Sequence, residues 1–195
     1  MFTGIVEELG EVVATEPAPG GITRLTVRGP LVSSDAADGD SIAVNGVCLT
    51  VTGTAGDTFT VDVVAETLGR TSIGGATRVN LERAVTPATR LGGHLVQGHV
   101  DGVGTLLERG ADNVLRIGLP PELTRYLVAK GSITVDGISL TVVEAAADSF
   151  TVALIPTTLA RTTLGHTPVG GPVNLEVDVV AKYVERLLSA GDLRS

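Results

Sequence analysis

The sequence predicts an all-β protein built as two copies of a six-stranded barrel, followed by one C-terminal helix. Two observations support this prediction. A long stretch of sequence occurs twice, and short runs of alternating apolar and polar residues, rich in β-branched side chains, are interrupted by Gly, Asp or Pro every 8–12 residues. Six short strands per copy close into a barrel more readily than they form an open sheet with two bare edges.

The repeat sets the organisation of the chain. SIAVNGVCLTV (Ser41–Val51) is matched 91 residues later by SITVDGISLTV (Ser132–Val142). DTFTV and DSFTV, and TLGRTSIG and TLARTTLG, follow at the same offset, while TGIVEELG and QGHVDGVG, and the two VNLE stretches, are 94 residues apart. Five ordered matches identify one fold written twice. We therefore infer function from what the copies share and where they differ.

The expected domains follow from the repeat. We expect a first barrel in residues 1–90, a second in residues 91–177, and a helix with its tail in residues 178–195. A linker with Pro87, Gly92 and Gly93 separates the copies. The expected strands are Ile5–Ala14, Ile22–Val27, Ser41–Val44, Val47–Thr54, Thr58–Val64 and Arg78–Ala84, then Val96–Glu108, Asn113–Gly118, Ser132–Val135, Ile138–Ala145, Ser149–Leu154 and Pro172–Val177.

Composition excludes several function classes. A net charge of −8 argues against nucleic acid, whose phosphates attract Lys and Arg. No apolar run is long enough to span a membrane, and the first residues lack the features of a signal peptide. The single cysteine can form neither an internal disulfide nor a multi-cysteine zinc site. We expect a cytoplasmic protein that binds no nucleic acid and no membrane.

The C-terminal segment DVVAKYVERLLSA (Asp178–Ala190) predicts an amphipathic helix capped by Asp178. Its expected apolar seam, near heptad spacing, consists of Val177, Val180, Val184, Leu187 and Leu188. The first copy has no such helix. Two interpretations remain open: the helix covers its own barrel, or it forms an oligomer interface.

Paired polar positions are the first candidates for chemistry. Cys48 follows an Asn-Gly turn, and Ser139 occupies the equivalent position in the second copy. Alternation along a strand places Cys48 with Thr50, and Ser139 with Thr141, on one face. These residues can line two similar pockets. The alternative is structural, because free cysteine is often a small buried apolar residue and Ser and Thr are common on strands.

Charged and titratable residues distinguish the copies. His99 replaces Ile5, and His94 lies in the linker; a histidine present in one copy alone is a candidate for proton transfer, or simply a hydrogen-bonded turn residue. Asp62 and Glu66 are replaced by Ala153 and Thr157, and Lys130 replaces Gly39; each can also be a solvated loop residue. No phosphate loop or nucleophile elbow is present. The pattern predicts two similar small-molecule sites without metal or cofactor.

In order along the chain, the motifs MFTGIVEELG, NGVCLTV, GGHLVQGHVDG, KGSITVDGISLTV and IPTTLARTTLG resemble the riboflavin synthase family, from Met1 to about Leu188. The resemblance implies two Greek-key barrels, a homotrimer formed through the C-terminal helix, and an active site between barrels of neighbouring subunits. It implies the dismutation of two 6,7-dimethyl-8-ribityllumazine molecules, by transfer of a four-carbon unit, to riboflavin and 5-amino-6-ribitylaminouracil. No metal or organic cofactor is implied, and the trimer can associate with lumazine synthase.

The resemblance also implies the site residues. The expected catalytic residues are His99, Cys48, Ser139 and His94, with His99 moving the proton and His94 supporting the interface. Phe2 and Thr3 are expected to line the site between subunits. The first substrate pocket is expected to use Gly4, Ile5, Val6, Cys48, Leu49, Thr50, Asp62, Val63, Val64, Ala65, Glu66 and Thr67. The second is expected to use Gly98, His99, Val100, Lys130, Ser139, Leu140, Thr141, Ala153, Leu154, Ile155, Pro156, Thr157 and Thr158.

Two rival functions remain open. One is an antenna-type lumazine or flavin carrier of the same superfamily, which binds without turnover. The other is a flavin-binding barrel of the ferredoxin-reductase type, which needs an R-x-Y-S-like motif and a nucleotide domain that the sequence lacks. The retained motif in both copies and the apolar seam of the final helix favour the enzyme over the carrier.

Overall fold

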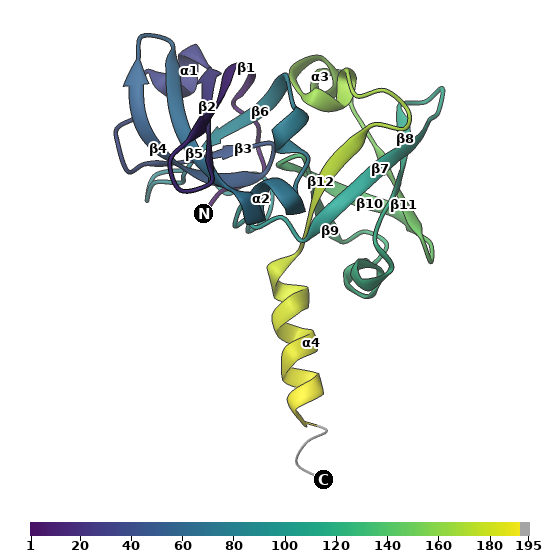
Figure 1. The fold of residues 1–195 in the computed structure, drawn as a ribbon. Helices are drawn as coiled ribbons and strands as arrows, with labels where there is room; N and C mark the ends of the chain where they lie inside the picture. Colours follow the sequence, from purple (N-terminus) through teal and green to yellow (C-terminus); the bar gives the residue numbers. More distant parts are fainter. Residues whose placement is uncertain (192–195) are drawn as a thin grey trace.

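Two closed six-stranded antiparallel barrels, each built by one copy of the repeat, make up the protein, and a single helix leaves the second barrel (Figure 1). The computed structural model describes residues 1–191. The last four residues of the predicted tail, 192–195, lie outside the described residues. The predicted fold class is confirmed.

The first barrel contains strands β1–β6, which close in the order β1-β2-β5-β4-β3-β6. The second contains β7–β12, and its closed order is the same one, strand for strand. β2 pairs with β5 rather than with β3, as a Greek-key connection requires. The strands are β1 (Glu8–Ala18), β2 (Ile22–Arg28), β3 (Ser41–Val44), β4 (Val47–Ala55), β5 (Thr58–Val64), β6 (Arg78–Arg83), β7 (Gly102–Arg109), β8 (Val114–Gly118), β9 (Ser132–Val135), β10 (Ile138–Ala145), β11 (Ser149–Ala153) and β12 (Pro172–Val177).

The short helices occur at equivalent places in both copies. The helices of the first copy are α1 (Pro30–Ser33), α2 (Ala65–Arg70) and the 3₁₀ turn η1 (Ile73–Gly75). Those of the second are η2 (Pro121–Tyr126), α3 (Pro156–Arg161) and η3 (Thr163–Gly165). η2 is a 3₁₀ helix, whereas α1, at the equivalent place in the first copy, is an α-helix.

Two strands begin later than predicted. β1 begins at Glu8 rather than Ile5, and β7 begins at Gly102 rather than Val96. The residues before them do not join a barrel ladder, because they bond to side chains and to the opposite barrel instead. The expected boundary at residue 90 falls between β6 and β7, and its exact position stays a prediction.

Each barrel has its own core of Val, Leu and Ile around one phenylalanine, Phe59 in the first and Phe150 in the second. A third, small cluster of Phe2, Ala43 and Val96 lies apart from both cores. Phe2 and Val96 pair as an isolated antiparallel bridge, so the N-terminal segments of the two copies meet. This bridge joins the two halves of the repeat.

Helix α4 (Val179–Gly191) projects away from both barrels (Figure 1). Asp178 caps it by accepting a hydrogen bond from the Val180 N–H at 2.9 Å. Its contacts with the second barrel are polar: Lys182 Nζ lies 2.6 Å from Asp101, and Glu185 bonds to Arg125 and Tyr126.

The apolar side chains of α4 stay exposed: Val180, Tyr183, Val184, Leu187 and Leu188. The interpretation that the helix covers its own barrel is therefore wrong. Including Val177 in the apolar seam was also wrong, because Val177 ends β12 and is buried in the core.

Candidate functional site

The two turns that precede the candidate nucleophiles pack back to back. Asn45 and Asp136 both have a φ of 46°, and the following Gly46 and Gly137 have φ of 76° and 79°. A Cβ on Gly46 would lie 2.7 Å from the Gly137 nitrogen, and the reverse distance is 2.8 Å. Only glycine fits this approach. The Asn-Gly and Asp-Gly pairs therefore fix the contact between barrels.

A reciprocal network of amides surrounds these turns. Asn80 Nδ2 donates to the Asp136 carbonyl and to Thr163 Oγ1, both at 2.8 Å. Its repeat equivalent Asn174 donates to the Asn45 carbonyl at 2.9 Å and accepts from the Ser72 N–H at 2.7 Å. Because each asparagine belongs to one barrel and bonds the other, the network fixes how the barrels are oriented.

The network has one asymmetry, at Asp136. Its Oδ1 accepts from the Asn174 N–H at 2.7 Å, while Asn45 makes the same bond to the Asn80 N–H in the first copy. Burial raises the pKa of Asp136 to about 7, although the bonds from Asn174 and Thr163 oppose that shift. The second copy therefore holds a buried acid where the first holds a neutral amide.

The N-terminal segment of each copy contacts the strand that carries the candidate nucleophile of the other copy. The Ser139 N–H donates to the Gly4 carbonyl at 2.8 Å, and the Cys48 N–H donates to the Gly98 carbonyl at 2.8 Å. Gly4 and Gly98 both have a φ of 77°, and a Cβ on either would come within 2.6 Å of the facing Cβ. Each predicted pocket is therefore completed by the other copy's N-terminal segment.

Two buried glutamates hold these segments in place. Glu82 accepts from Thr3 N and Thr3 Oγ1 at 2.6 and 2.7 Å and from Gly4 N at 3.0 Å. Glu176 accepts from three successive backbone N–H groups, those of Gln97, Gly98 and His99, at 2.7–2.9 Å. Burial raises the pKa of both carboxyls, and the N–H donors oppose the shift. The sequence prediction of site residues did not include these glutamates, although each of them ends one of the two VNLE stretches.

The first candidate pocket is an open strip on the outside of the first barrel. Leu49 and Val51 of β4 point into the core, so Cys48 and Thr50 point outward, beside Asp62 and Val64 at the end of β5. We call these four residues the first outer face. Leu49 and Val63 are buried in the core, so they can offer only backbone groups to a ligand.

Some predicted residues of this pocket are engaged elsewhere. Asp62 forms a two-bond ion pair with Arg24, at 2.7 and 2.9 Å, which lowers the pKa of Asp62. Glu66 pairs with Arg70 one turn along α2. Ala65 and Ile5 are exposed and Thr67 is half-buried, while the half-buried Val6 packs against the core of the second barrel instead of the first outer face.

The second candidate pocket repeats this arrangement. We call Ser139, Thr141, Ala153 and Ile155 the second outer face; Ser139 is half-buried and the other three are exposed. Leu154 is buried, while Pro156 and Thr157 are exposed and Leu140, Val100 and Thr158 are intermediate. The predicted sets are equivalent between the copies, but the structure exchanges their N-terminal members, because Gly4 lies against Ser139 and Gly98 lies against Cys48. The roles of these residues stay predictions.

Lys130 stands in a conformation that suits glycine. Its φ is 69°, and its repeat equivalent Gly39 has a φ of 94°. Both backbones make the same bond, from Lys130 N to the Val142 carbonyl at 2.8 Å and from Gly39 N to the Val51 carbonyl at 2.9 Å. A non-glycine residue costs about 1–2 kcal/mol in this conformation. This strain marks the exposed Lys130 side chain as a candidate functional group.

His94 and His99 lie in different surroundings. His99 is exposed, and its backbone N–H is held by Glu176. His94 is half-buried: its Nδ1 lies 2.6 Å from Ser139 Oγ, and its Nε2 lies 3.1 Å from Thr134 Oγ1. Burial lowers the pKa of His94, and the Asp178 charge opposes that shift. His94 therefore contacts a predicted site residue directly, and the sequence prediction did not include Thr134.

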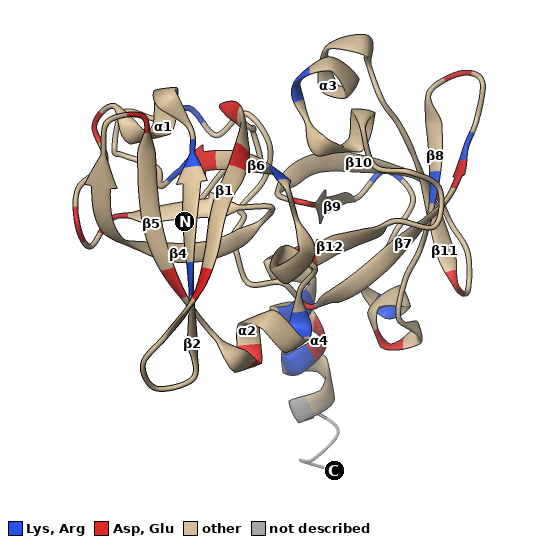
Figure 2. Cartoon of the chain, turned by 45° about the horizontal axis from the view of Figure 1, so that its top comes forward, with Lys and Arg blue, Asp and Glu red and all other residues tan. Residues whose placement is uncertain are grey.

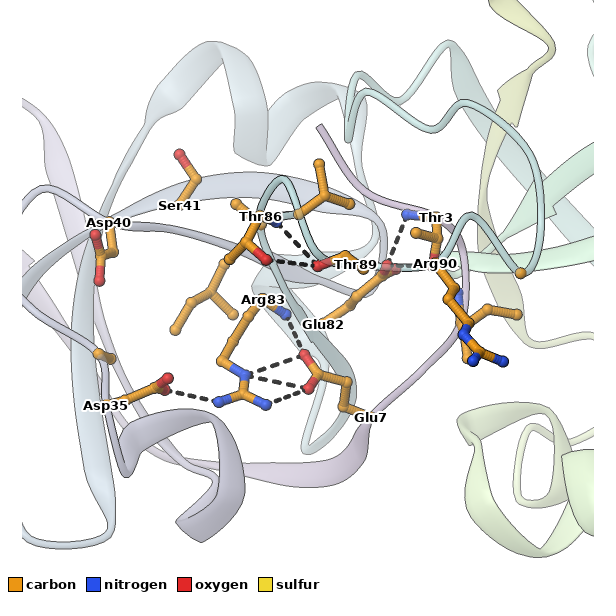
Figure 3. Close-up of a pocket in the computed structure, with 16 residues that line it drawn as sticks. Thr3, Glu7, Asp35, Asp40, Ser41, Glu82, Arg83, Thr86, Thr89 and Arg90 are labelled. Atoms are coloured by element: carbon orange, nitrogen blue, oxygen red, sulfur yellow. Dashed lines mark hydrogen bonds and ion pairs between the residues drawn. The ribbon is translucent and has the colours of Figure 1, made fainter.

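A cavity of about 740 Å³ adjoins the first outer face (Figure 3). It is lined by Ile5 and by Ser41, the strand partner of Thr50. Figure 3 shows Arg83 held between Glu7 and Asp35, at 2.5 and 2.7 Å, beside the paired hydroxyls of Thr86 and Thr89. Its volume suits a small-molecule site. The sequence prediction missed most of its lining, which comes from the N-terminal segment, the loop before β3, β6 and the linker.

The described residues, 1–191, form neither a basic patch in the view of Figure 2 nor a metal-binding cluster. In the view of Figure 2, Lys and Arg positions are scattered over both barrels and the base of α4 rather than gathered on one face. Among residues 1–191, no group of three or more His, Cys, Asp or Glu side chains is placed to hold a metal ion. Within the same residues, no helix is long and apolar enough to cross a membrane.

Comparison with known proteins identifies the class. The family model of the lumazine binding domain matches residues 3–84 and 97–178, one match for each barrel. Riboflavin synthase of Mycobacterium bovis is 59% identical over 202 residues, covering 98% of this chain and 100% of that protein. Riboflavin synthase of Actinobacillus pleuropneumoniae is 48% identical, covering 96% and 90%.

Solved structures agree with the fold. LumP complexed with riboflavin has a TM-score of 0.81 at 25% identity, and LumP complexed with 6,7-dimethyl-8-(1'-D-ribityl) lumazine has a TM-score of 0.80 at 24% identity. Each covers 91% of this chain and 99% of the other. With two lumazine-binding domains and relatives similar over nearly the whole chain, the protein belongs to the riboflavin synthase family.

Proposed function

We propose that this protein is an enzyme that converts two molecules of 6,7-dimethyl-8-ribityllumazine into riboflavin and 5-amino-6-ribitylaminouracil by transfer of a four-carbon unit. The observation that carries the proposal is the doubled site. Both barrels present an outer face with a small nucleophile-type side chain, Cys48 or Ser139, and a threonine two residues later, each completed by a glutamate-held segment. A reaction that consumes two identical molecules needs the same molecule held twice.

The residues have distinct proposed roles. Backbone groups at the strand ends hold the pyrimidinedione edge, and hydroxyls such as those of Thr50 and Thr141 hold the ribityl chain. His99 is exposed next to Gly98, whose carbonyl accepts from the Cys48 N–H at the first outer face, and it takes the methyl proton from one lumazine. Cys48 and Ser139 orient or activate the rings. Much of the rate then comes from holding two reactants in register. The substrate-binding residues are those predicted from the resemblance, and no cofactor is proposed.

We also propose that the reacting pair assembles between subunits of a homotrimer. Within one chain, the Phe2–Val96 bridge separates the segment that contacts Ser139 from the segment that contacts Cys48. The second lumazine is therefore supplied by a neighbouring subunit, with Phe2 and Thr3 close to the junction. The exposed apolar side chains of α4 support a helical contact at the centre of this trimer. Mass measurement in solution tests it: three chains are expected, and a single chain contradicts the proposal.

Three further expectations belong to this function. A biosynthetic role and a single half-buried cysteine support a cytoplasmic location. Association with lumazine synthase is proposed from the family resemblance, and co-purification of the two proteins tests it. The domain boundaries are proposed at residues 90/91 and 177/178, and limited proteolysis between β6 and β7 tests the first of them.

The test of the activity uses the lumazine alone. Purified protein is incubated with 6,7-dimethyl-8-ribityllumazine in buffer containing a metal chelator, and riboflavin is measured by absorbance. The proposal predicts one riboflavin for every two lumazines consumed. Saturable binding without riboflavin formation would identify a carrier instead and would reduce the site residues to recognition.

A further inference from the structure

A chain of three polar groups lies in the second barrel, from Thr134 through His94 to Ser139. His94 Nε2 lies 3.1 Å from Thr134 Oγ1, and His94 Nδ1 lies 2.6 Å from Ser139 Oγ. Thr134 is 1% exposed, on β9 next to β10. Ser139 is half-buried at the second outer face. The chain therefore runs from a buried hydroxyl to one that reaches the candidate ligand site.

The first barrel lacks the side chains for an equivalent series of hydrogen bonds. Ala43 stands at the position of Thr134, and Cys48 stands at the position of Ser139, each 91 residues earlier. Ala43 is 3% exposed and has no hydroxyl, so it packs against Phe2 and Val96 instead. A cysteine S–H is a weak donor. The differences fall on strand positions that are otherwise aligned, so the backbone is the same and the hydrogen-bond chemistry is not.

The available acceptors determine which group donates in each of these two hydrogen bonds. Among residues 1–191, His94 Nε2 is the only acceptor within hydrogen-bond distance of the buried Thr134 hydroxyl. A buried hydroxyl left without an acceptor is destabilising, so Thr134 donates to Nε2. A neutral imidazole then carries its proton on Nδ1, which donates to Ser139 Oγ. The Ser139 hydrogen remains free to point toward the outer face.

We propose that Thr134 and His94 are positioning residues that make Ser139 a fixed hydrogen-bond donor to the ligand on the second barrel. The acceptor is a carbonyl oxygen or ring nitrogen of that ligand. This assignment rests on the proposed function, and it gives the two barrels different roles. The lumazine on the second barrel is the molecule that gains negative charge when its methyl proton leaves, because an oriented donor stabilises charge that develops on its acceptor.

The tautomer of His94 is the direct test. The protein is labelled with ¹⁵N-histidine, and the Nδ1 and Nε2 resonances are recorded at pH 8, with His94 assigned by comparison with His94→Gln. The expected result is a neutral ring protonated on Nδ1. A ring protonated on Nε2 overturns the proposal, because Ser139 would then donate to His94 instead of to the ligand.

Variants connect the tautomer to the ligand. Thr134→Val removes the partner of Nε2, so we expect a mixed tautomer, an affinity for 6,7-dimethyl-8-ribityllumazine at least 3-fold weaker, and kcat/KM at least 5-fold lower. Thr134→Ser should restore all three. Thr151→Val is the matched control: it removes another buried strand hydroxyl of the same barrel, one that bonds to the Glu144 N–H at 3.2 Å, and should change none of them.

The outcomes separate this proposal from the proposed function. If the wild-type protein binds the lumazine without forming riboflavin, the proposed function fails, while the tautomer and the lumazine affinity still decide the role of Thr134. If Thr134→Val leaves the tautomer and the affinity unchanged, the positioning role is wrong whatever the activity. If Thr134→Val lowers affinity and Thr134→Ser does not restore it, the effect is packing and the proposal is also wrong.

Discussion

The two barrels have the same strand order and the same backbone contacts, and they differ in the side chains placed at equivalent points. Glu82 and Glu176 hold equivalent segments in both. By contrast, Ala43, Asn45 and Cys48 of the first barrel become Thr134, Asp136 and Ser139 in the second. The shared residues fix the frame of the two proposed sites, and the different residues give those sites different hydrogen-bonding and charge properties.

Duplication explains this division. Residues that build the contact between copies, such as the paired glycines and the reciprocal asparagines, are constrained by both halves at once. Residues on the outer faces, where we propose that the ligand binds, are not constrained in this way. In the proposed reaction two identical lumazine molecules react differently. Such a reaction needs two sites with the same backbone arrangement and different side chains.

The largest effect is expected from removing the two glutamates that hold the N-terminal segments in both barrels. Glu82→Ala and Glu176→Ala each leave buried backbone N–H groups without an acceptor, so each should lower the free energy of unfolding by about 3 kcal/mol or more. Urea denaturation measures it. The comparison predicts similar losses in both variants. A loss confined to one of them would show that the two clamps are not equivalent.

The buried acid gives the next effect. The pKa of Asp136 is raised to about 7 in the folded protein from an ordinary value near 3.8, so the unfolded chain ionises first as pH rises. The contribution of Asp136 to stability therefore falls between about pH 4 and pH 7.

Asp136→Asn places the residue of the first barrel in the second and removes this titration. At pH 8 the variant should be more stable than the wild-type protein by about 4 kcal/mol, because the pKa of Asp136 rises from 3.8 to about 7 and each pKa unit corresponds to 1.36 kcal/mol. At pH 4 the two should differ little. Denaturation at both pH values is the measurement, and an equal difference at both would contradict the raised pKa.

The reactive side chains come next. Ser139→Ala, Cys48→Ala and His99→Ala should each lower turnover at least ~10-fold, which corresponds to about 1.4 kcal/mol in the barrier. Steady-state rates of riboflavin formation provide the measurement. Cys48→Ser should retain more activity than Ser139→Cys, because only the second barrel directs a histidine at this position. Equal rates for the two exchanges would remove the distinction between the outer faces.

The smallest effect concerns the strained lysine. Lys130→Gly places the residue of the first barrel in a backbone that suits it, so stability should rise by up to about 1 kcal/mol. Substrate affinity should fall, because the ammonium group is lost. Gly39→Ala is the converse control and should lower stability. Unchanged affinity for the lumazine in Lys130→Gly would show that the strain serves no ligand.

Much of the fold could be predicted from the sequence because the same alternation of apolar and polar residues occurs in both copies of the repeat. Strands such as Ser132–Val135 and Pro172–Val177 lie where alternation placed them. The starts of β1 and β7 could not be located, because an extended segment reads the same whether it bonds to a barrel strand or to Glu82. The direction of α4 was likewise left open, since an apolar seam does not reveal what covers it.

The candidate site was predicted in part for a similar reason. Cys48 and Ser139 were visible as aligned polar residues on strands. Glu176 and Thr134 act through bonds between segments far apart in the sequence, and their burial gives no pattern that distinguishes them from other strand residues. The repeated VNLE motif was the available signal for Glu176, and the aligned difference between Ala43 and Thr134 was the available signal for Thr134. Reading the differences on buried strand positions, as well as on exposed ones, would have found it.

The most direct test of the account is complementation between the barrels. Cys48→Ala and Ser139→Ala are purified separately, mixed under conditions that exchange subunits, and assayed for riboflavin formation, with mass measurement to verify mixed assemblies. The account predicts that the mixture is several-fold more active than either variant, because an intact first barrel then meets an intact second barrel from a neighbouring chain. Mixed assemblies no more active than their components would contradict a site shared between subunits.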